Sequence, residues 1–364
     1  MKNTYYYILL LFHFFAISYS QHTIIDSLTL EKISFVEIYS DNGNLIGLTN
    51  DHGEISTQLN SEILESKTKS LTFIHSTFNN KNVPIKLFIN NPVIYLSPIF
   101  LQLKEVIIVP KPKKYKYLKL KGYFRSIQIN DDKPQYFIDG IVDYYISIKS
   151  SKIKNRILSN RSIENKSIRQ ISSSFHFSVA GAPTFNKFFI YENLLNQYNL
   201  DELKGGAIKL LDKIDGKEKG VFKILKNNSV MQLEIISKEN PKKISLFGIE
   251  SNFNNYTTNV IYTTNNIAKM DLENLTYFKE IRNYNVKRKK DKKYTRIDST
   301  HEFFLIDKEY VNEIDSKGFD SFYSFLTPSN YIEEYWKNID NELFQPLPKS
   351  LETYIEQNLI EVKK

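Results

Sequence analysis

The stretch GYFRSIQINDDKPQYFIDGIVDYY, residues 122–145, decides what kind of fold the larger part of this chain adopts. Two runs of alternating apolar and polar residues flank residues 130–134, where Asn, Asp and Pro are typical of a turn. Alternation with a period of two places every second side chain on one face of a strand. The stretch therefore predicts a β-hairpin with one buried face.

Similar runs follow along the chain, and they extend the hairpin into a larger antiparallel sheet. We expect strands at residues 146–153, 220–236, 243–252, 259–267, 277–284 and 294–306. Apolar residues recur at helical spacing in residues 187–203, 331–339 and 351–359, so helices are expected to cover one face of the sheet. This aromatic-rich region, residues 122–364, resembles the curved sheet around a helix of lipoprotein carriers.

Residues 23–109 show a different rhythm, with short apolar runs and turn signals about every ten residues, as in a small β-sandwich. Gly43 and Gly53 fall in turns where the backbone is expected to need positive φ. The expected strands lie at residues 33–39, 45–49, 54–59, 71–75, 83–89, 93–96 and 105–109. The whole chain is thus expected to be mainly β, a sandwich followed by an antiparallel sheet domain with a few helices.

Four short segments of residues 21–109 carry a family resemblance. They are IID at 24–26, ISFVEI at 33–38, TNDHGEI at 49–55 and LKEVIIV at 103–109. Together they resemble the carboxypeptidase regulatory-like domain, a seven-stranded Greek-key sandwich of transthyretin type, common in secreted envelope proteins of Gram-negative bacteria. His22 replaces a usual glycine, and HSTF at 75–78 replaces a typical S-x-x-G-[YF] run. The resemblance implies packing and adhesion rather than catalysis.

Residues 1–20 have the pattern of a secretory signal peptide. Lys2 is followed by an apolar run of about a dozen residues and by a small-x-small site at 18–20. We therefore expect an exported protein that is periplasmic, outer-membrane-associated or extracellular. The run is shorter than the roughly 20 apolar residues that a bilayer crossing needs, so we expect no transmembrane span in the mature chain.

Residues 110–121, PKPKKYKYLKLK, contain two prolines and six lysines without an acid, which favours a basic linker between the two domains. The alternation that begins at Tyr115 is also compatible with the start of the next strand. The expected domains are thus residues 21–109 and 122–364.

Composition limits the classes of function. The 364 residues include no cysteine, so disulfides and thiolate metal sites are excluded. The formal net charge is +8, and its excess lies in lysine, which binds phosphate less specifically than arginine. We therefore expect no nucleic-acid partner, and an envelope protein or an anionic outer-membrane surface as the partner.

Motifs for metal, nucleophilic or phosphate chemistry are missing from the sequence. The mature histidines, which include no H-E-x-x-H pair, are expected in turns or on the surface; they are His22, His52, His75, His176 and His301. Residues 178–183 are expected to form a small-residue loop without G-x-S-x-G, and Gly205-Gly206 is expected to be a turn or a helix stop rather than a phosphate loop. We assign no catalytic, cofactor-binding or metal residue and no cofactor.

Acidic pairs occur at Asp131-Asp132 and at Asp139 with Asp143, and glycosidases use two such carboxylates. We interpret Asp139 instead as part of a turn. The loop 41–43 offers too few oxygen ligands for a calcium site.

Residues 287–293, KRKKDKK, are the sharpest charge feature of the chain. We expect a solvated hairpin tip, with contact to anionic lipid headgroups, lipopolysaccharide phosphates or an acidic protein as the functional alternative. The aromatic groups Tyr144-Tyr145 and Tyr331 with Tyr335-Trp336 are core rather than sugar platforms in the preferred interpretation.

The sequence thus favours a non-enzymatic envelope protein that binds or scaffolds a partner through the regulatory-like sandwich. Two alternatives stay open: a carrier of an apolar or lipid ligand in the C-terminal domain, and a hydrolase without a linear motif.

Overall fold

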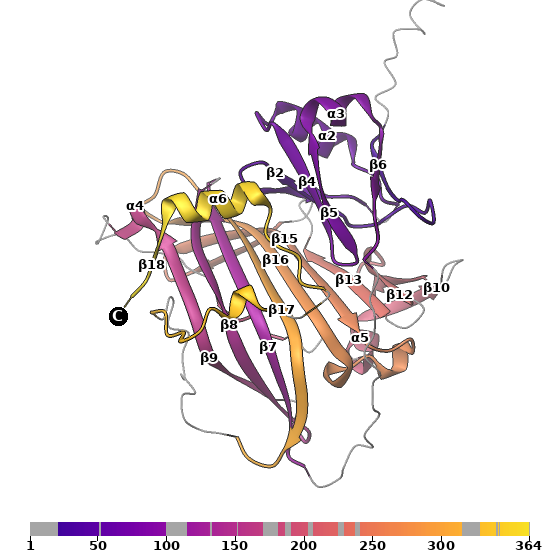
Figure 1. The fold of residues 1–364 in the computed structure, drawn as a ribbon. Coiled ribbons are helices and arrows are strands. Elements are labelled where there is room, and N and C mark those ends of the chain that lie inside the picture. Colours follow the sequence, from indigo (N-terminus) through magenta and orange to yellow (C-terminus); the bar gives the residue numbers. More distant parts are fainter. Residues whose placement is uncertain are drawn as a thin grey trace, which may run out of the picture. The chain divides into compact units, whose positions relative to one another are not determined.

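The computed structural model describes residues 21–50, 52–99, 115–131, 133–150, 152–169, 181–185, 191–202, 207–224, 229–236, 241–314, 328–339, 341 and 343–363. The predicted signal peptide, the closing strand at 105–109, His176, and Gly205-Gly206 lie outside these residues. The chain divides into two compact units, Met1–Ser40 with Ile46–Pro98 and Asp41–Leu45 with Ile99–Lys364. The fold is mainly β, as predicted (Figure 1).

The first unit contains a four-stranded sheet in the order β3-β2-β4-β5 and a parallel pair, β1 with β6. Buried Ile38, Phe73 and Phe88 belong to its core. Gly43 and Gly53 have positive φ, as predicted. The elements are β1 (Thr23–Asp26), β2 (Glu37–Ser40), β3 (Leu45–Leu48), α2 (Thr57–Glu65), β4 (Ser70–His75), β5 (Phe78–Pro84), α3 (Ile85–Asn90) and β6 (Val93–Leu96).

Two strand predictions in the first unit are wrong, because helices α2 and α3 take up much of residues 54–59 and 83–89. Ser56 caps α2, since its Oγ accepts a hydrogen bond from the Leu59 amide at 3.2 Å. Leu59 and Ile63, four residues apart, then face the core together. A cap with helical apolar spacing therefore prevails over the strand pattern.

The second unit is built on a twelve-stranded sheet in the order β10-β11-β12-β13-β15-β16-β17-β7-β8-β9-β18, with β14 paired to β15. Its strands are β7 (Tyr117–Asn130), β8 (Lys133–Ser147), β9 (Ile153–Asn165), β10 (Tyr198–Glu202), β11 (Ala207–Asp212), β12 (Glu218–Ile224), β13 (Ser229–Ile236), β14 (Lys242–Leu246), β15 (Ile249–Tyr262), β16 (Leu275–Arg288), β17 (Thr295–Val311) and β18 (Leu359–Glu361). The hairpin predicted from residues 122–145 is confirmed as β7 and β8, with Asp131 at positive φ in the turn.

One face of this sheet, which we call the core face, carries the largest apolar cluster. Phe124, Phe278 and Phe303 project from neighbouring strands into it. Phe185 and Leu194 pack against them. The short elements of the unit are α4 (Lys166–Arg169), α5 (Tyr191–Gln197), η2 (Ile267–Lys269) and η3 (Leu272–Asn274).

The opposite face, the covered face, lies beneath the C-terminal segment 328–363. Helix α6 (Lys349–Asn358) places Leu351 and Ile355 on Ile127 and Phe137, and Figure 1 shows it lying across the strands. The helix predicted at residues 351–359 is therefore confirmed.

Other boundaries differ from the predictions. Residues 331–339 contain only the 3₁₀ turn η4 (Tyr335–Lys337), because their aromatic side chains pack onto the sheet instead of along one helical stripe. Residues 198–202 pair with β11 as a strand, so among the described residues of 187–203 only α5 is helical.

Three connections are placed differently from the sequence patterns. Residues 148–150 form a turn after β8, where Ser150 bonds Ser147, instead of continuing a strand. The run 243–252 is interrupted by a turn at Phe247-Gly248. Strand β7 begins at Tyr117, inside the predicted linker 110–121, because residues 117–121 pair with both β17 and β8.

Candidate functional site

The hairpin formed by β14 and β15 ends in an unusual two-residue turn. Phe247 and Gly248 have φ values of 49° and 76°, so both central residues are left-handed, as in a type I′ turn. Asn, Asp and Gly are preferred at the first of these positions, and a bulky residue there costs roughly 1–2 kcal/mol. The backbone is thus strained at Phe247.

The side chains around this turn are exposed although they are apolar. Phe247 is 94% exposed and Leu246 is 60% exposed, while Ile244 on the same face of β14 is 43% exposed. Scattered exposed apolar residues are common on proteins, but three within four residues form a small apolar apex.

The apex adjoins the cationic segment 287–293. The Lys289 amide donates a hydrogen bond to the Gly248 carbonyl oxygen at 2.8 Å, and Ile249 is the cross-strand partner of Arg288. Residues 287–293 lie at the turn between β16 and β17, so the predicted hairpin tip is confirmed. We call residues 242–250 with residues 287–294 the tip.

Charge at the tip is strongly unbalanced. Eight cationic side chains face two acidic ones, which leaves a net charge of +6. Lys287 pairs with Glu250 at 3.2 Å, and Arg288 pairs with Asp291 at 2.9 Å. Within the described part of the chain, no ion-pair partner accompanies the remaining lysines of the segment, which are Lys289, Lys290, Lys292 and Lys293.

Glu250 links the two hairpins of the tip. Its carboxylate accepts a hydrogen bond from the Tyr294 hydroxyl at 2.9 Å as well as the Lys287 contact. These two partners lower the pKa of Glu250. The Lys287 Nζ also lies 4.7 Å from the centre of the Tyr294 ring.

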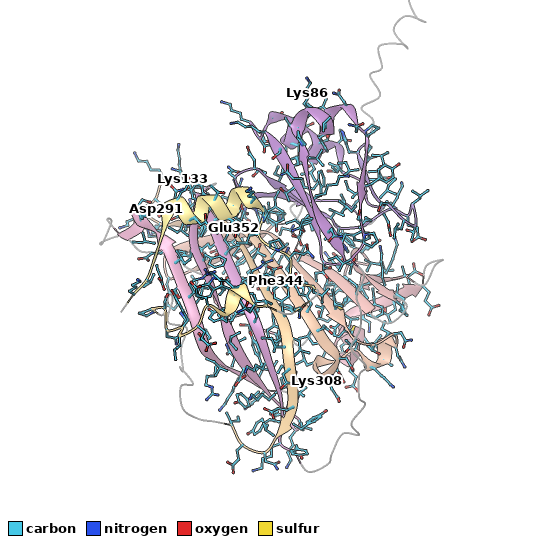
Figure 2. All side chains as sticks on the ribbon, in the orientation of Figure 1. Lys86, Lys133, Asp291, Lys308, Phe344 and Glu352 are labelled. Carbon is cyan, nitrogen blue, oxygen red and sulfur yellow. The ribbon has the colours of Figure 1, made fainter. Side chains whose placement is uncertain are left out.

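The neighbouring β7–β8 turn lies at the same end of the sheet, where the Arg296 amide donates to Asp131 at 2.9 Å (Figure 2).

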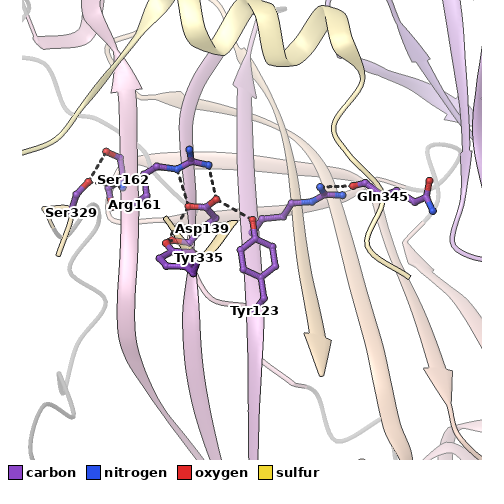
Figure 3. Close-up of polar contacts among 8 residues, drawn as sticks. Tyr123, Asp139, Arg161, Ser162, Ser329, Tyr335 and Gln345 are labelled. Carbon is purple, nitrogen blue, oxygen red and sulfur yellow. Dashed lines mark hydrogen bonds and ion pairs between the residues drawn. The ribbon is translucent and has the colours of Figure 1, made fainter. Parts of the chain in front are cut away.

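The predicted carboxylate pair, Asp139 and Asp143, lies in the middle of β8 and not in a turn, which corrects the sequence interpretation. Asp139 is 0% exposed and accepts two hydrogen bonds from Arg161, at 3.1 and 2.7 Å, and one from the Tyr123 hydroxyl at 3.0 Å (Figure 3). Asp143 lies 3.3 Å from Arg156. Both carboxylates are thus engaged by arginines.

Asp139 belongs to a row of five charges that crosses the covered face. Cross-strand pairing aligns residues of alternating sign on β16, β17, β7, β8 and β9; we call them the charge row, and they are Lys279, Glu302, Arg125, Asp139 and Arg161. Directly opposite charges on neighbouring strands stabilise a sheet.

The C-terminal segment shields the charge row. The Arg125 Nη1 donates to the Gln345 carbonyl oxygen at 2.6 Å, and the Tyr335 hydroxyl donates to the Asp139 carbonyl oxygen at 2.9 Å (Figure 3). The Arg161 guanidinium lies 3.9 Å from the centre of the Trp336 ring. Trp336 is therefore packed, as predicted, but against an arginine and in a 3₁₀ turn.

Burial and ion pairing shift the pKa values of these carboxyl groups in opposite directions. Burial raises the pKa of Asp139, and the nearby Arg161 opposes this effect only in part. Burial also acts to raise the pKa of Glu302, but Arg125 and Lys279 outweigh it, so that this pKa lies below its usual value. The Arg125 guanidinium donates from Nε to Glu302.

His301 and Ser126 form a pair on the core face, on the opposite side of the sheet from the charge row. No linear motif in the sequence predicted this pair. The Ser126 Oγ and the His301 Nδ1 are 2.8 Å apart on adjacent strands. Burial and the neighbouring Arg282 lower the pKa of His301 to about 3. Glu280, the cross-strand neighbour of His301, is bonded instead to Arg282 and the Tyr256 hydroxyl. The pair is thus a buried neutral contact without a carboxylate on the histidine.

The remaining predicted residues are dispersed. His22 is buried, stacks on Phe88 and donates to its carbonyl oxygen at 2.8 Å, so His22 and His301 contradict the prediction of surface or turn histidines. His52 is exposed in a turn, as predicted. Tyr144 and Tyr145 are buried, which confirms a core role. In the part of the chain that the structure covers, no group of three or more His, Cys, Asp or Glu side chains is arranged to hold a metal ion.

Comparison with known proteins gives little. No family model matches the chain and no curated protein matches it significantly, so the resemblance to the carboxypeptidase regulatory-like domain stays a prediction. Among solved structures, one match is titled "Lipid-protein interactions in lipovitellin", with a TM-score of 0.27 and 6% sequence identity. The match covers 55% of this chain and 26% of that chain, and at this TM-score it carries no argument.

Proposed function

We propose that this protein is a non-enzymatic component of the cell envelope that attaches to an anionic surface through the tip. The observation that carries the proposal is the set of exposed lysines that have no acidic partner in the described part of the chain and lie beside an apolar apex. Such a concentration of one sign of charge attracts a surface of the opposite sign and raises the rate of encounter. In the described residues, no helix is both long and apolar enough to cross a membrane.

The other polar clusters support a non-enzymatic role. The carboxylates of the charge row are occupied by arginines beneath the C-terminal segment, and glycosidase chemistry requires carboxyl groups that are open to substrate and water. The Ser126–His301 pair is buried, and a general base needs a pKa near the working pH, whereas His301 has a pKa of about 3.

The carrier alternative receives no support from the core face. Among the described residues, Phe185, Leu194 and Met270 pack with the apolar side chains that the strands carry on this face. Leu28 and Leu30 of the first unit are exposed, but no accompanying charge pattern identifies a partner for them. The proposal therefore places binding at the tip, and the sandwich is proposed as a packing module.

Retention on phosphocellulose tests the proposal, because this support offers phosphate groups without a bilayer. The four-lysine variant carries Gln at Lys289, Lys290, Lys292 and Lys293. A control variant carries Gln at four other exposed lysines of the second unit, Lys149, Lys152, Lys217 and Lys269, and has the same net charge. We expect the four-lysine variant to elute at clearly lower salt than the control, since screening weakens exposed charges. Elution of both variants at the same salt concentration would refute a role for the tip.

A further inference from the structure

Among the described residues, no packing contact explains the strained turn at the apex. Phe247 occupies a left-handed position that Asn would adopt more cheaply, and its ring is 94% exposed. Strained backbone that persists without a packing gain is a reason to look for function. The strained backbone at Phe247 thus holds an aromatic ring in an exposed position.

The neighbours of the ring indicate what it meets. Leu246 and Ile244 extend the apolar surface along β14, while Lys289 begins the adjoining cationic turn. A soluble polyanion would be bound by the lysines alone, with no use for an exposed ring, and an acidic protein would use the ring only if it offered an apolar pocket beside its carboxylates. A bilayer interface uses both, because apolar side chains enter the headgroup–acyl boundary while lysine stems reach back to the phosphates.

We propose that the tip docks on an anionic lipid bilayer, with Phe247 and Leu246 inserted at the headgroup–acyl boundary and the four unpaired lysines against lipid phosphates. This inference rests on the proposed function and names the surface. Burial of one Phe ring strengthens binding by roughly tenfold to a hundredfold. Four lysines near an anionic leaflet contribute on the order of a hundredfold or more, and salt reduces their share.

Sedimentation with vesicles measures both contributions. The vesicles contain phosphatidylcholine with about a third phosphatidylglycerol, so that the surface is anionic. The variant Phe247→Asn suits the turn and should fold, and Ile214→Asn is the matched control, since Ile214 is a 96% exposed apolar residue in another turn of the second unit. We expect Phe247→Asn to bind vesicles about tenfold more weakly while its retention on phosphocellulose is unchanged, and Ile214→Asn to bind like the unaltered protein.

Direct evidence for insertion comes from a fluorescent label at the apex. The chain has no cysteine, so Phe247→Cys offers a single site for an environment-sensitive dye, and Ile214→Cys offers the control site. Quenching of the dye at position 247, but not at 214, by spin labels attached to lipid acyl chains is the expected result.

The outcomes separate the two proposals. Vesicle binding that depends on the four lysines but not on Phe247, with the dye at 247 remaining in water, would overturn insertion and leave anionic attachment intact. If Phe247→Asn weakened retention on phosphocellulose as much as it weakened binding to vesicles, insertion would also be overturned. Binding of the four-lysine variant like the control on both supports would overturn the proposed function itself.

Discussion

The charge row and the tip both involve strands β16 and β17 and the same kinds of side chain. They differ in that charges are buried and paired in the charge row but exposed at the tip. In the charge row, Lys279, Glu302 and Arg125 alternate in sign across the sheet and are buried. At the tip, in the turn that joins these two strands, four lysines are exposed and have no acidic partner among the described residues. Within the sheet, the strand register places opposite charges side by side, so they pair with one another. In the turn, the lysines are left exposed and can bind a partner.

Removal of one member of the charge row should have the largest effect on stability. Asp139→Asn leaves the Arg161 guanidinium beneath Trp336 without its carboxylate. A broken buried pair costs about 3–5 kcal/mol, and the partial exposure of Arg161 places the expected loss near the lower end, about 3 kcal/mol. Urea unfolding followed by circular dichroism measures this loss.

The matched change at the tip is Asp291→Asn, which breaks the exposed pair with Arg288. Solvent and salt screen exposed pairs, which therefore add little to stability, so this variant should unfold close to the unaltered protein. Equal losses for the two variants would show that the contrast between paired and unpaired regions does not hold.

The pH dependence of stability tests the buried histidine behind the row. The pKa of His301 is about 3 in the folded protein and 6.5 in the unfolded chain, so the unfolded chain binds the proton first as pH falls. The stability linked to neutral His301 is fully present above about pH 6.5 and is lost progressively toward pH 3. Relative to His301→Gln, the unaltered protein should lose about 2–3 kcal/mol between pH 7 and pH 4.5.

Urea midpoints of both proteins at the two pH values give this difference directly, and the variant at pH 7 serves as the reference. A difference that stays constant with pH would mean that His301 does not hold a depressed pKa.

The smallest expected effect has the opposite sign. Phe247→Asn relieves the left-handed strain at the apex and should stabilise the protein by about 1 kcal/mol, which thermal unfolding resolves as a small rise in Tm. If Phe247→Asn gains stability and loses vesicle binding, the Phe247 side chain serves binding at the expense of stability. A fall in Tm would instead show that the ring contributes to packing.

Local patterns predicted the elements whose signals lie close together in the chain. The β7–β8 hairpin has its alternation and its turn within residues 122–145, and the cationic turn at 287–293 has its charges in one run. Helix α6 was recognised for the same reason, since Leu351, Ile355 and Leu359 lie four residues apart. The apex was missed because residues 243–252 resemble one strand unless Gly248 is assigned a positive φ.

The charge row could not be predicted, because its residues come from five strands and span positions 125 to 302. The pairing of β17 with β7 joins residues about 177 positions apart, as for Arg125 with Glu302, and no local pattern encodes that register. The same holds for Ser126 and His301, whose contact follows from the next residue pair of the same register.

The sequence by itself determined that the chain is mainly β, that it lacks cysteine, and where its cations concentrate, because alternation, composition and charge runs act over a few neighbouring residues. Only the tertiary structure decided which charges are buried in pairs and which remain exposed. It also brought the turn of β14–β15 beside the cationic turn through the Lys289–Gly248 hydrogen bond. The physical reason is that strand order and register depend on burial summed over the whole sheet.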